Sequence, residues 1–386
     1  MEITKDIKYI GVDDLDIDLF ESQYIVPNGI SYNSYLIKDE KIAIMDTVDI
    51  RKSDLWWENL NAALDGRTPD YLVVHHMEPD HAGSIGQVIE KYPNIKLVAS
   101  DKAVKMLHQF FENVDFTDNI ISIKEGDSLS LGEHTLTFYM APMVHWPEVM
   151  VSYDSKDKVL FSADGFGKFG ALSHEEDWAC EARRYYFNIV GKYGQPTQML
   201  LKKAAKLDIQ IICPLHGPIL TENLGYYIGL YDTWSKYDVE TEGVFIAYAS
   251  IYGSTAKVAH KLAEILKEKG APKVSIADLC RDDMAEAVED AFRMGKLVVA
   301  ASSYEGGLFT PMHTFLHHLE SKKYQKRKVG IVENGSWAPC SGKIMHDMLS
   351  KMSNVEVVEP IVTIWSTMKQ KDIPALESLA QSILSK

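Results

Sequence analysis

The carboxyl-terminal part of the chain alternates apolar runs with helical patterns, and this alternation constrains the fold more than any other feature. The apolar runs are VFIAYAS (244–250), KVSIADL (273–279), KLVVAAS (296–302), KVGIVEN (328–334) and VEVVEPIVTI (355–364). The helical patterns that separate and follow them cover 255–269, 282–293, 311–321, 342–352 and 373–385. Five β-α units of this length predict a doubly wound parallel sheet, with a ligand at the carboxyl ends of its strands.

The earlier part of the chain reads as short strands with few long helices. Its strand candidates are rich in β-branched and aromatic residues, and they cover 41–48, 71–76, 95–100, 134–142, 148–154, 158–164 and 209–217. Helical patterns lie between some of them, for example at 83–92 and 181–193. This mixture predicts sheets covered by helices in an αββα layering. A chain of 386 residues is long enough for two domains, which we place at 1–242 and 243–386.

Composition excludes several classes of protein. The four cysteines are widely spaced and form no C-x-x-C pair, so neither a disulfide framework nor a rubredoxin site is expected. A formal net charge of −15 argues against nucleic acid and anionic membrane surfaces as partners. The chain shows neither a signal-peptide pattern nor an apolar run of about 18 residues, so we expect a cytoplasmic protein.

Potential metal ligands are concentrated in one short segment, VVHHMEPDHAGS (73–84). It contains His76, Glu78, Asp80 and His81. Three further candidates, each at the end of a predicted strand, are His145, Asp164 and His216. Each of these alone is more often a structural or turn residue than a ligand. Four separated segments that end at one edge are hard to obtain by chance, and together they predict a metal site.

His75 is expected to lie outside this site. Neighbouring residues in a strand point to opposite faces, so His75 and His76 do not both enter one site easily. In an extended chain, residues 76, 78 and 80 share one side. His75 is therefore predicted to be a core residue or a residue behind the ligands.

A second group of residues points to a bound phosphate ester. The loop after 244–250 carries Ser250, Tyr252, Gly253, Ser254 and Thr255 at the start of a helical pattern, where hydroxyl and N–H groups form an anion site. No Lys precedes Thr255 as in a Walker A loop, so a phosphate monoester is expected. The loops after two later strands supply Ser302, Tyr304, Glu305, Gly306, Gly307, Asn334, Gly335, Ser336 and Trp337. Their glycines permit close backbone approach and their aromatic rings suit a flat cofactor.

The order of these motifs resembles a known family. H-x-E-x-D-H, followed by HWP, FSAD and HGPI, is similar to the metallo-β-lactamase-like half of the flavodiiron proteins, and the first loop resembles the FMN phosphate loop of flavodoxins. The resemblance covers the chain from about Ile3 to its end. It implies an N-terminal metallo-β-lactamase-like αββα sandwich and a C-terminal flavodoxin-like sheet, with FMN and two iron ions as cofactors.

Glu78 is the residue that indicates which metal the site binds. Zinc hydrolases of the superfamily have H-x-H-x-D-H, with a histidine where this chain has Glu78. A carboxylate makes the site harder and more anionic, which favours iron over zinc. Glu78, Asp80 and Asp164, with one bridging hydroxide, would neutralise two Fe(II) ions, as a buried site requires.

The resemblance also implies roles for individual residues. One iron would be held by His76, Glu78 and His145, the other by Asp80, His81 and His216, and Asp164 would bridge them. In some family members water replaces the equivalent of His81. HWPE stands where many relatives have HWPD, so Glu148 is left out of the ligand set. Tyr193 is predicted to be a catalytic residue of the gas pocket.

The activity implied is the reduction of dioxygen to water, of nitric oxide to nitrous oxide, or of both. Two Fe(II) ions and a reduced flavin hold the four electrons that dioxygen needs. The donor is expected to be a separate rubredoxin-type protein or a deazaflavin-type cofactor. A head-to-tail homodimer, or a tetramer, would bring the flavin of one chain to the irons of the other.

Two alternatives stay open at this stage. The chain could be a zinc hydrolase fused to a flavodoxin-like module. It could also be a non-enzymatic electron-transfer flavoprotein whose metal site is structural. Some relatives place a histidine near the substrate pocket that SQYIVPNGISYN (22–33) lacks, so the preferred gas is also left open.

Overall fold

The computed structural model describes residues 1–385, and their contacts form two compact units. The first unit contains Met1–Tyr185 and Gln195–Asp232, and the second contains Tyr186–Gly194 and the chain from Thr233 onward. The boundary between domains at residues 242 and 243 stays a prediction.

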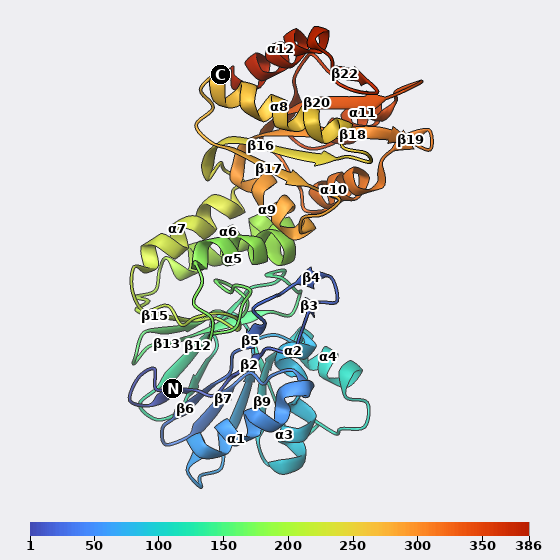
Figure 1. The fold of residues 1–386 in the computed structure, drawn as a ribbon. Coiled ribbons are helices and arrows are strands. Elements are labelled where there is room, and N and C mark those ends of the chain that lie inside the picture. Colours follow the sequence, from blue (N-terminus) through green and yellow to red (C-terminus); the bar gives the residue numbers. More distant parts are fainter. Residues whose placement is uncertain (386) are drawn as a thin grey trace. The chain divides into compact units, whose positions relative to one another are not determined.

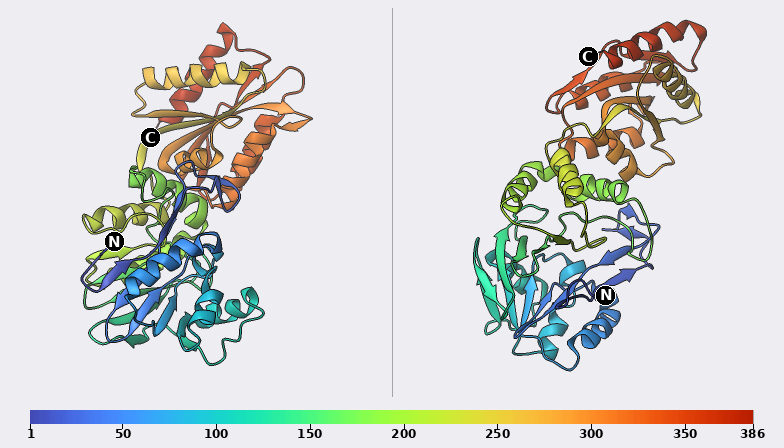
Figure 2. Two further views of the ribbon diagram at one scale, coloured as in Figure 1. Left: turned by 60° about the horizontal axis from the view of Figure 1, so that its bottom comes forward. Right: turned by 90° about the vertical axis from the view of Figure 1, so that its left-hand side faces the viewer.

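The first unit is built on two sheets that face each other (Figure 2). The six-stranded sheet has the order β1 (Ile7–Tyr9), β6 (Tyr35–Lys38), β7 (Ile42–Met45), β8 (Tyr71–Val74), β9 (Lys96–Ser100), β10 (Ile120–Ile123). The five-stranded sheet has the order β11 (Ser128–Ser130), β12 (Thr135–Met140), β13 (Met150–Asp154), β14 (Val159–Phe161), β15 (Ile211–Cys213). Val73 and Val98 of the first sheet share one buried core with Phe138 and Phe161 of the second. The predicted sandwich is confirmed.

Several helices before residue 242 were not singled out in the sequence. The longer helices of this part are α1 (Ser53–Leu64), α4 (Asp101–Phe110), α6 (Gly194–Ala204) and α7 (Leu224–Ser235) (Figure 1). The shorter ones include α3 (Ile85–Lys91) and α5 (Trp178–Tyr185). In α1, the buried residues Trp56, Leu60 and Leu64 recur every four positions. They form the apolar stripe of a surface helix, which is harder to read among polar residues than a short apolar strand.

Two small ribbons complete the first unit. One pairs β2 (Val12–Asp14) with β5 (Ile30–Tyr32), and the other pairs β3 (Leu19–Phe20) with β4 (Tyr24–Ile25).

The second unit contains the predicted doubly wound sheet. Its order is β17 (Val274–Asp278), β16 (Thr241–Ala249), β18 (Met294–Tyr304), β20 (Arg327–Gly335), β21 (Val355–Val357). β22 (Val362–Trp365) also pairs with β20, and the short β19 (Gly307–Leu308) pairs with the end of β18. In chain order the strands lie 2-1-3-4-5, with all pairs parallel except β18–β19. This is the flavodoxin-like order, whose ligand site lies at the carboxyl ends of the strands.

Helices cover both faces of this sheet (Figure 1). One face packs against α8 (Ser254–Glu268) and α12 (Ile373–Leu384), whose apolar residues share a core with β16 and β18. The other carries α9 (Met284–Arg293), α10 (Thr310–Ser321) and α11 (Ser341–Leu349). Among residues 1–385, no helix is both long and apolar enough to span a membrane.

Candidate functional site

The segment after β8 leaves the strand earlier than the sequence suggested. β8 ends at Val74, and a short helical turn, α2, covers Pro79–Ala82. The expectation that residues 76–80 form one extended chain was therefore wrong beyond Glu78. Pro79 stands at the start of the turn, where its fixed φ suits a helix. Asp80 and His81 consequently lie in this turn, whereas His76 and Glu78 precede it.

Four of the seven predicted ligands form one group, whose ligand atoms all lie within 4.8 Å of one another. Its members are His76, Glu78, His145 and Asp164. Nε2 of His145 lies 3.0 Å from Oε2 of Glu78, and Nε2 of His76 lies 3.2 Å from the same oxygen. Oδ2 of Asp164 is 3.2 Å from Nε2 of His76 and 3.1 Å from Nε2 of His145. All four side chains are largely buried.

The other three predicted ligands, Asp80, His81 and His216, form a second group. The Nε2 atoms of His81 and His216 are 3.1 Å apart, and Oδ2 of Asp80 lies 3.4 Å and 3.3 Å from them. Oδ1 of Asp164 is 3.3 Å from Nε2 of His81. Asp164 thus presents one oxygen to each group, as a bridging carboxylate would.

The residues present fit a pair of metal ions. Both carboxylate oxygens of Asp80 and of Asp164 are buried without a hydrogen-bond partner. In each group two imidazole Nε2 atoms face each other, at 3.3 Å between His76 and His145 and 3.1 Å between His81 and His216. Buried polar atoms normally have partners. Lone pairs that converge on one space without partners are what a metal ion satisfies.

Residues behind the ligands fix the imidazole rings. Nδ1 of His76 lies 2.7 Å from Oε1 of Glu148, and Nδ1 of His216 lies 2.7 Å from the carbonyl oxygen of Ser31. Donation from each Nδ1 leaves the lone pair on Nε2, on the side of the cluster. Sequence reasoning missed both partners. Glu148 stands in the HWPE motif, whose position next to His145 was the available signal.

His75 points away from the cluster, as predicted. Its Nδ1 lies 2.5 Å from Oδ2 of Asp46, and its Nε2 lies 2.7 Å from Oγ of Ser152. All three side chains are buried. His75 therefore links β13 to the end of β7, and the metal groups do not include it.

The carboxylates and imidazoles around Asp164 shift one another's pKa values. Burial opposes the charge on Asp164, but the imidazoles of His76, His145 and His81 hold its pKa well below the usual range. Burial lowers the pKa of His145, but Asp164 and Glu78 outweigh it and raise that pKa to about 9. Without a metal, the site therefore holds protons between its carboxylates and imidazoles.

A tyrosine that the sequence analysis did not select lies next to the cluster. Tyr185, at the end of α5, is fully buried, and its ring centre is 5.5 Å from that of His216. Burial and then the charges of Asp164, Glu78 and Asp80 raise its pKa well above the usual value. Its hydroxyl is therefore protonated at neutral pH.

The predicted catalytic residue Tyr193 lies elsewhere in the chain. It belongs to a 3-10 turn, Gly191–Tyr193, which the contacts assign to the second unit, whereas all seven metal candidates lie in the first. Its aromatic ring lies 5.9 Å from Nζ of Lys192. A role in the gas pocket stays a prediction for Tyr193. The residue that borders the cluster, Tyr185, stands a few positions earlier, in the segment EARRYY (181–186).

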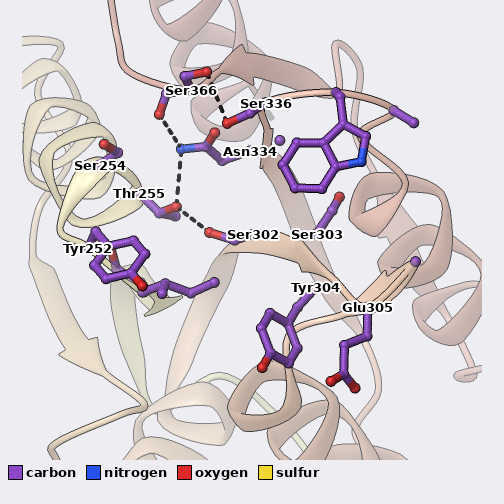
Figure 3. A pocket seen from close by; sticks show the side chains of 16 residues that line it. Tyr252, Ser254, Thr255, Ser302, Ser303, Tyr304, Glu305, Asn334, Ser336 and Ser366 are labelled. Carbon is purple, nitrogen blue, oxygen red and sulfur yellow. Dashed lines mark hydrogen bonds between the residues drawn. The ribbon is translucent and has the colours of Figure 1, made fainter.

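In the second unit, a cavity of about 590 Å³ opens at the carboxyl ends of the strands (Figure 3). Twelve of the predicted cofactor-binding residues line it: Ser250, Tyr252, Ser254, Thr255, Ser302, Tyr304, Glu305, Gly306, Asn334, Gly335, Ser336 and Trp337. Gly253 caps α8, and Gly307 begins β19 beside the cavity loop. The lining also includes Ile251, Ser303, Ala338 and Ser366, which the prediction missed. Ser366 directly follows β22, so the fifth strand contributes a loop as well.

Hydrogen bonds join the cavity loops (Figure 3). Oγ1 of Thr255 lies 2.9 Å from Oγ of Ser302, and Nδ2 of Asn334 donates to Thr255 Oγ1 at 3.3 Å and to the carbonyl oxygen of Ser366 at 3.1 Å. These contacts join the ends of β18 and β20 to the start of α8 and to the loop after β22. Such preformed sites are typical of cofactor binding.

The cavity fits a flat aromatic cofactor with a phosphate group. Gly253 has φ +86° and a Cβ built there would meet no atom within 4 Å, so the backbone at the start of α8 borders open space. Helix N-termini of this kind bind phosphate. Tyr304 and Trp337 are 45% and 82% exposed, so their rings are free to cover a bound ring system.

Comparison with known proteins gives consistent matches. A family model described as "ODP family beta lactamase" matches residues 30–217. The nitric oxide reductase of Moorella thermoacetica is 30% identical over 400 residues, covering 100% of this chain and 98% of that protein.

Solved structures agree over nearly the whole chain. Rubredoxin oxygen:oxidoreductase from the anaerobe Desulfovibrio gigas has a TM-score of 0.93 and 27% identity, covering 99% of this chain and 97% of that chain. The flavodiiron protein of Giardia intestinalis has a TM-score of 0.88 with 21% identity, over 99% of this chain and 96% of that chain, and is similar in fold.

Proposed function

This chain belongs to the flavodiiron protein family, and on that premise we propose that it reduces dioxygen to water, nitric oxide to nitrous oxide, or both. The single observation that carries the proposal is Asp164, whose two unpartnered oxygens face two separate groups of ligands. This arrangement fits two metal ions, and Glu78 in the place of a histidine favours iron over zinc. The names of the similar proteins, which are reductases, do not favour the alternatives of a zinc hydrolase or a non-enzymatic flavoprotein.

Each metal position is assigned from the side chains that surround it. His76, Glu78 and His145 would hold one iron, and Asp80, His81 and His216 the other, with Asp164 between them. The inward position of His81 Nε2, 3.1 Å from that of His216, supports His81 as a direct ligand. When bound, the two irons supply redox chemistry and open coordination positions for a small gas, and FMN supplies electrons to them.

The chain's own residues orient the ligands and hold protons. Glu148 and Ser31 accept from the Nδ1 atoms of His76 and His216 and so fix the ring tautomers. The Tyr185 hydroxyl stays protonated because burial and the charges of Asp164, Glu78 and Asp80 raise its pKa, and it is a candidate donor of a proton or hydrogen bond to a reduced gas. We therefore propose Tyr185 as a pocket residue alongside the predicted Tyr193.

FMN would occupy the cavity of the second unit. The start of α8 would bind the phosphate through backbone N–H groups and the hydroxyls of Ser254 and Thr255. Tyr304 and Trp337 would cover the ring system from the two later loops. None of the lining residues that the structure describes is Lys or Arg, which suits a phosphate held by hydrogen bonds.

Partners follow from the need to deliver electrons. We propose an external donor of the rubredoxin type, or a deazaflavin-type cofactor. We also propose a head-to-tail homodimer or a tetramer, in which the flavin of one chain serves the irons of another. A cytoplasmic location is likewise part of the proposal.

One experiment tests the function directly. The purified chain is assayed for iron and FMN, reduced anaerobically, and mixed in a stopped-flow instrument with dioxygen or nitric oxide separately. We expect about two irons and one FMN per chain and rapid reoxidation by at least one gas. A preparation with full iron and FMN that neither gas reoxidises would contradict the proposed function.

A further inference from the structure

A third cluster of potential metal ligands lies in the five-stranded sheet, apart from the seven residues described above. It consists of His134, Asp154 and Asp157, whose ligand atoms all lie within 4.8 Å of one another. His134 directly precedes β12, Asp154 is the last residue of β13, and Asp157 lies in the turn to β14. The cluster is therefore at one end of three consecutive antiparallel strands.

The backbone around this cluster is fixed by hydrogen bonds. The N–H of His134 donates to Oδ2 of Asp39 at 2.6 Å, and its carbonyl oxygen accepts from the N–H of Leu131 at 2.9 Å. The N–H of Asp157 donates to Oδ2 of Asp154 at 2.9 Å. The backbone that carries the ligands is thus held in place by the sheet and its turns, as a built site requires.

The imidazole of His134 is buried and lacks partners. Its side chain is 0% exposed, and neither Nδ1 nor Nε2 makes a hydrogen bond. Oδ1 of Asp154, also on a side chain that is 0% exposed, has no partner either. Buried polar atoms without partners are rare in folded proteins, and each one calls for an explanation such as a bound ion.

A simple ion pair between His134 and an aspartate does not account for these buried atoms without hydrogen-bond partners. Nδ1 of His134 is 3.1 Å from Oδ2 of Asp154, but the contact lacks the direction of a hydrogen bond. On the other side, Nε2 lies 3.6 Å from Oδ2 of Asp6, which is too long for one. A separation near 3.1 Å is what two ligands of one ion show when each lies about 2.0–2.2 Å from it.

The local charge also favours a cation. Carboxylates of Asp154, Asp157 and Asp6 lie beside the imidazole, and the ammonium of Lys156 lies next to Asp6. The Lys156 ammonium is already engaged, at 2.8 Å from Asp6 and 2.7 Å from Glu133. Oδ2 of Asp157 accepts from Oγ1 of Thr4 at 2.5 Å, but within residues 1–385 neither Asp154 nor Asp157 forms an ion pair with a lysine. A divalent ion would offset their charge.

We propose that His134, Asp154 and Asp157 form a binding site for a divalent transition-metal ion of the zinc class, separate from the paired iron site. One imidazole nitrogen and two carboxylate oxygens are suitable ligands for such an ion, and water completes its coordination. Ser155 and Lys156 at the turn are exposed and Asp157 is half-buried, so the ion reaches the site from solvent. Bound there, it joins the β11–β12 hairpin to the β13–β14 turn.

The test uses the holoenzyme with iron and FMN in place and Zn²⁺ as the probe. The protein is dialysed against micromolar Zn²⁺, and zinc and iron are measured in the same samples. Wild type is expected to bind about one zinc beyond any iron that is lost. His134→Gln and Asp157→Asn are expected to lower the affinity for this extra zinc at least about tenfold. His174→Gln, which removes an exposed histidine outside the cluster, is the matched control.

A second measurement guards against a variant that folds poorly. Zn²⁺ should raise the midpoint of thermal unfolding of the iron-loaded wild type and of His174→Gln, but not that of Asp157→Asn, whose side chain is only half-buried. The proposal is wrong if the wild type binds no zinc in excess of the iron that it loses. It is also wrong if His134→Gln and Asp157→Asn bind as much of this extra zinc as the wild type does.

Discussion

Glu78 is the residue that selects the metal. Replacing its carboxylate by imidazole in Glu78→His would give the ligand pattern of the zinc hydrolases and remove one negative charge from the cluster. We expect the zinc-to-iron ratio of the purified protein to rise at least about tenfold and gas reduction to fall in proportion. Elemental analysis and stopped-flow reoxidation check this result. Glu58→Gln, at an exposed position of α1, should leave both unchanged.

The pKa of His145 predicts how iron binding depends on pH. The carboxylates around His145 raise its pKa to about 9 in the metal-free chain, so the ring is protonated at pH 7. An imidazole must be neutral to bind a metal ion, so binding of iron releases the proton of His145. The affinity for iron should therefore rise with pH up to about 9. Anaerobic titration with Fe(II) in weak buffer should release about one proton or more per chain. Equal affinity at pH 6 and pH 8 would contradict this expectation.

Two tyrosines compete for the role in the pocket, and one pair of variants separates them. Tyr185→Phe removes a buried, protonated hydroxyl beside the cluster and should slow gas reduction about tenfold or more, with iron and FMN content unchanged. Tyr193→Phe, in the 3-10 turn, should have little effect if Tyr185 has the role. Stopped-flow rates of the reduced proteins decide between them. Slow gas reduction in Tyr193→Phe, with a normal rate in Tyr185→Phe, would instead support Tyr193 as the pocket residue.

At the scale of elements, the loop at the start of α8 makes a prediction with an internal control. Gly253 and Gly270 flank this helix, have φ +86° and +87°, and face open space. Alanine at either position should cost about 1 kcal/mol of stability, because L-residues disfavour this conformation. Only Gly253→Ala places a methyl group where we expect the phosphate. We therefore expect FMN affinity, measured by fluorescence titration, to fall about tenfold in Gly253→Ala and not in Gly270→Ala. An equal loss of FMN affinity in both variants would contradict a phosphate site in this loop.

Elements were predictable from the sequence where one local pattern determines them. Parallel strands buried on both faces read as continuous apolar runs, and β16, β18 and β20 followed directly. Pro360 lies between β21 and β22, so the single run at 355–364 became two strands. The turn Pro79–Ala82 is too short to show helical periodicity, which explains the wrong geometry expected for Asp80.

The outer partners of the metal ligands could not be predicted in this way. Glu148 and His76 are 72 positions apart, and Ser31 and His216 are 185 apart. Only the folded sheets bring such residues together, since no local period connects them. The ligand types themselves were readable because metal chemistry restricts them to a few residues at strand ends.

At the scale of the whole molecule, the proposed exchange of electrons between chains can be tested by mixing two defective chains. Asp164→Asn removes the bridging carboxylate, and Gly253→Asp places a negative charge at the proposed phosphate site. Each homo-oligomer should be inactive. If the flavin of one chain serves the irons of its partner, a co-expressed assembly of the two variants contains one intact pair of sites.

Such a mixed assembly, purified through two different affinity tags, should recover about half of the wild-type activity per dimer. If electrons instead pass from flavin to iron within one chain, every route in the mixed assembly contains one defective site, and activity stays absent. Light scattering on the same samples should give a mass of two or four chains of 43.5 kDa. A fully active monomer would exclude the exchange altogether, because a single chain then completes the path from donor to gas alone.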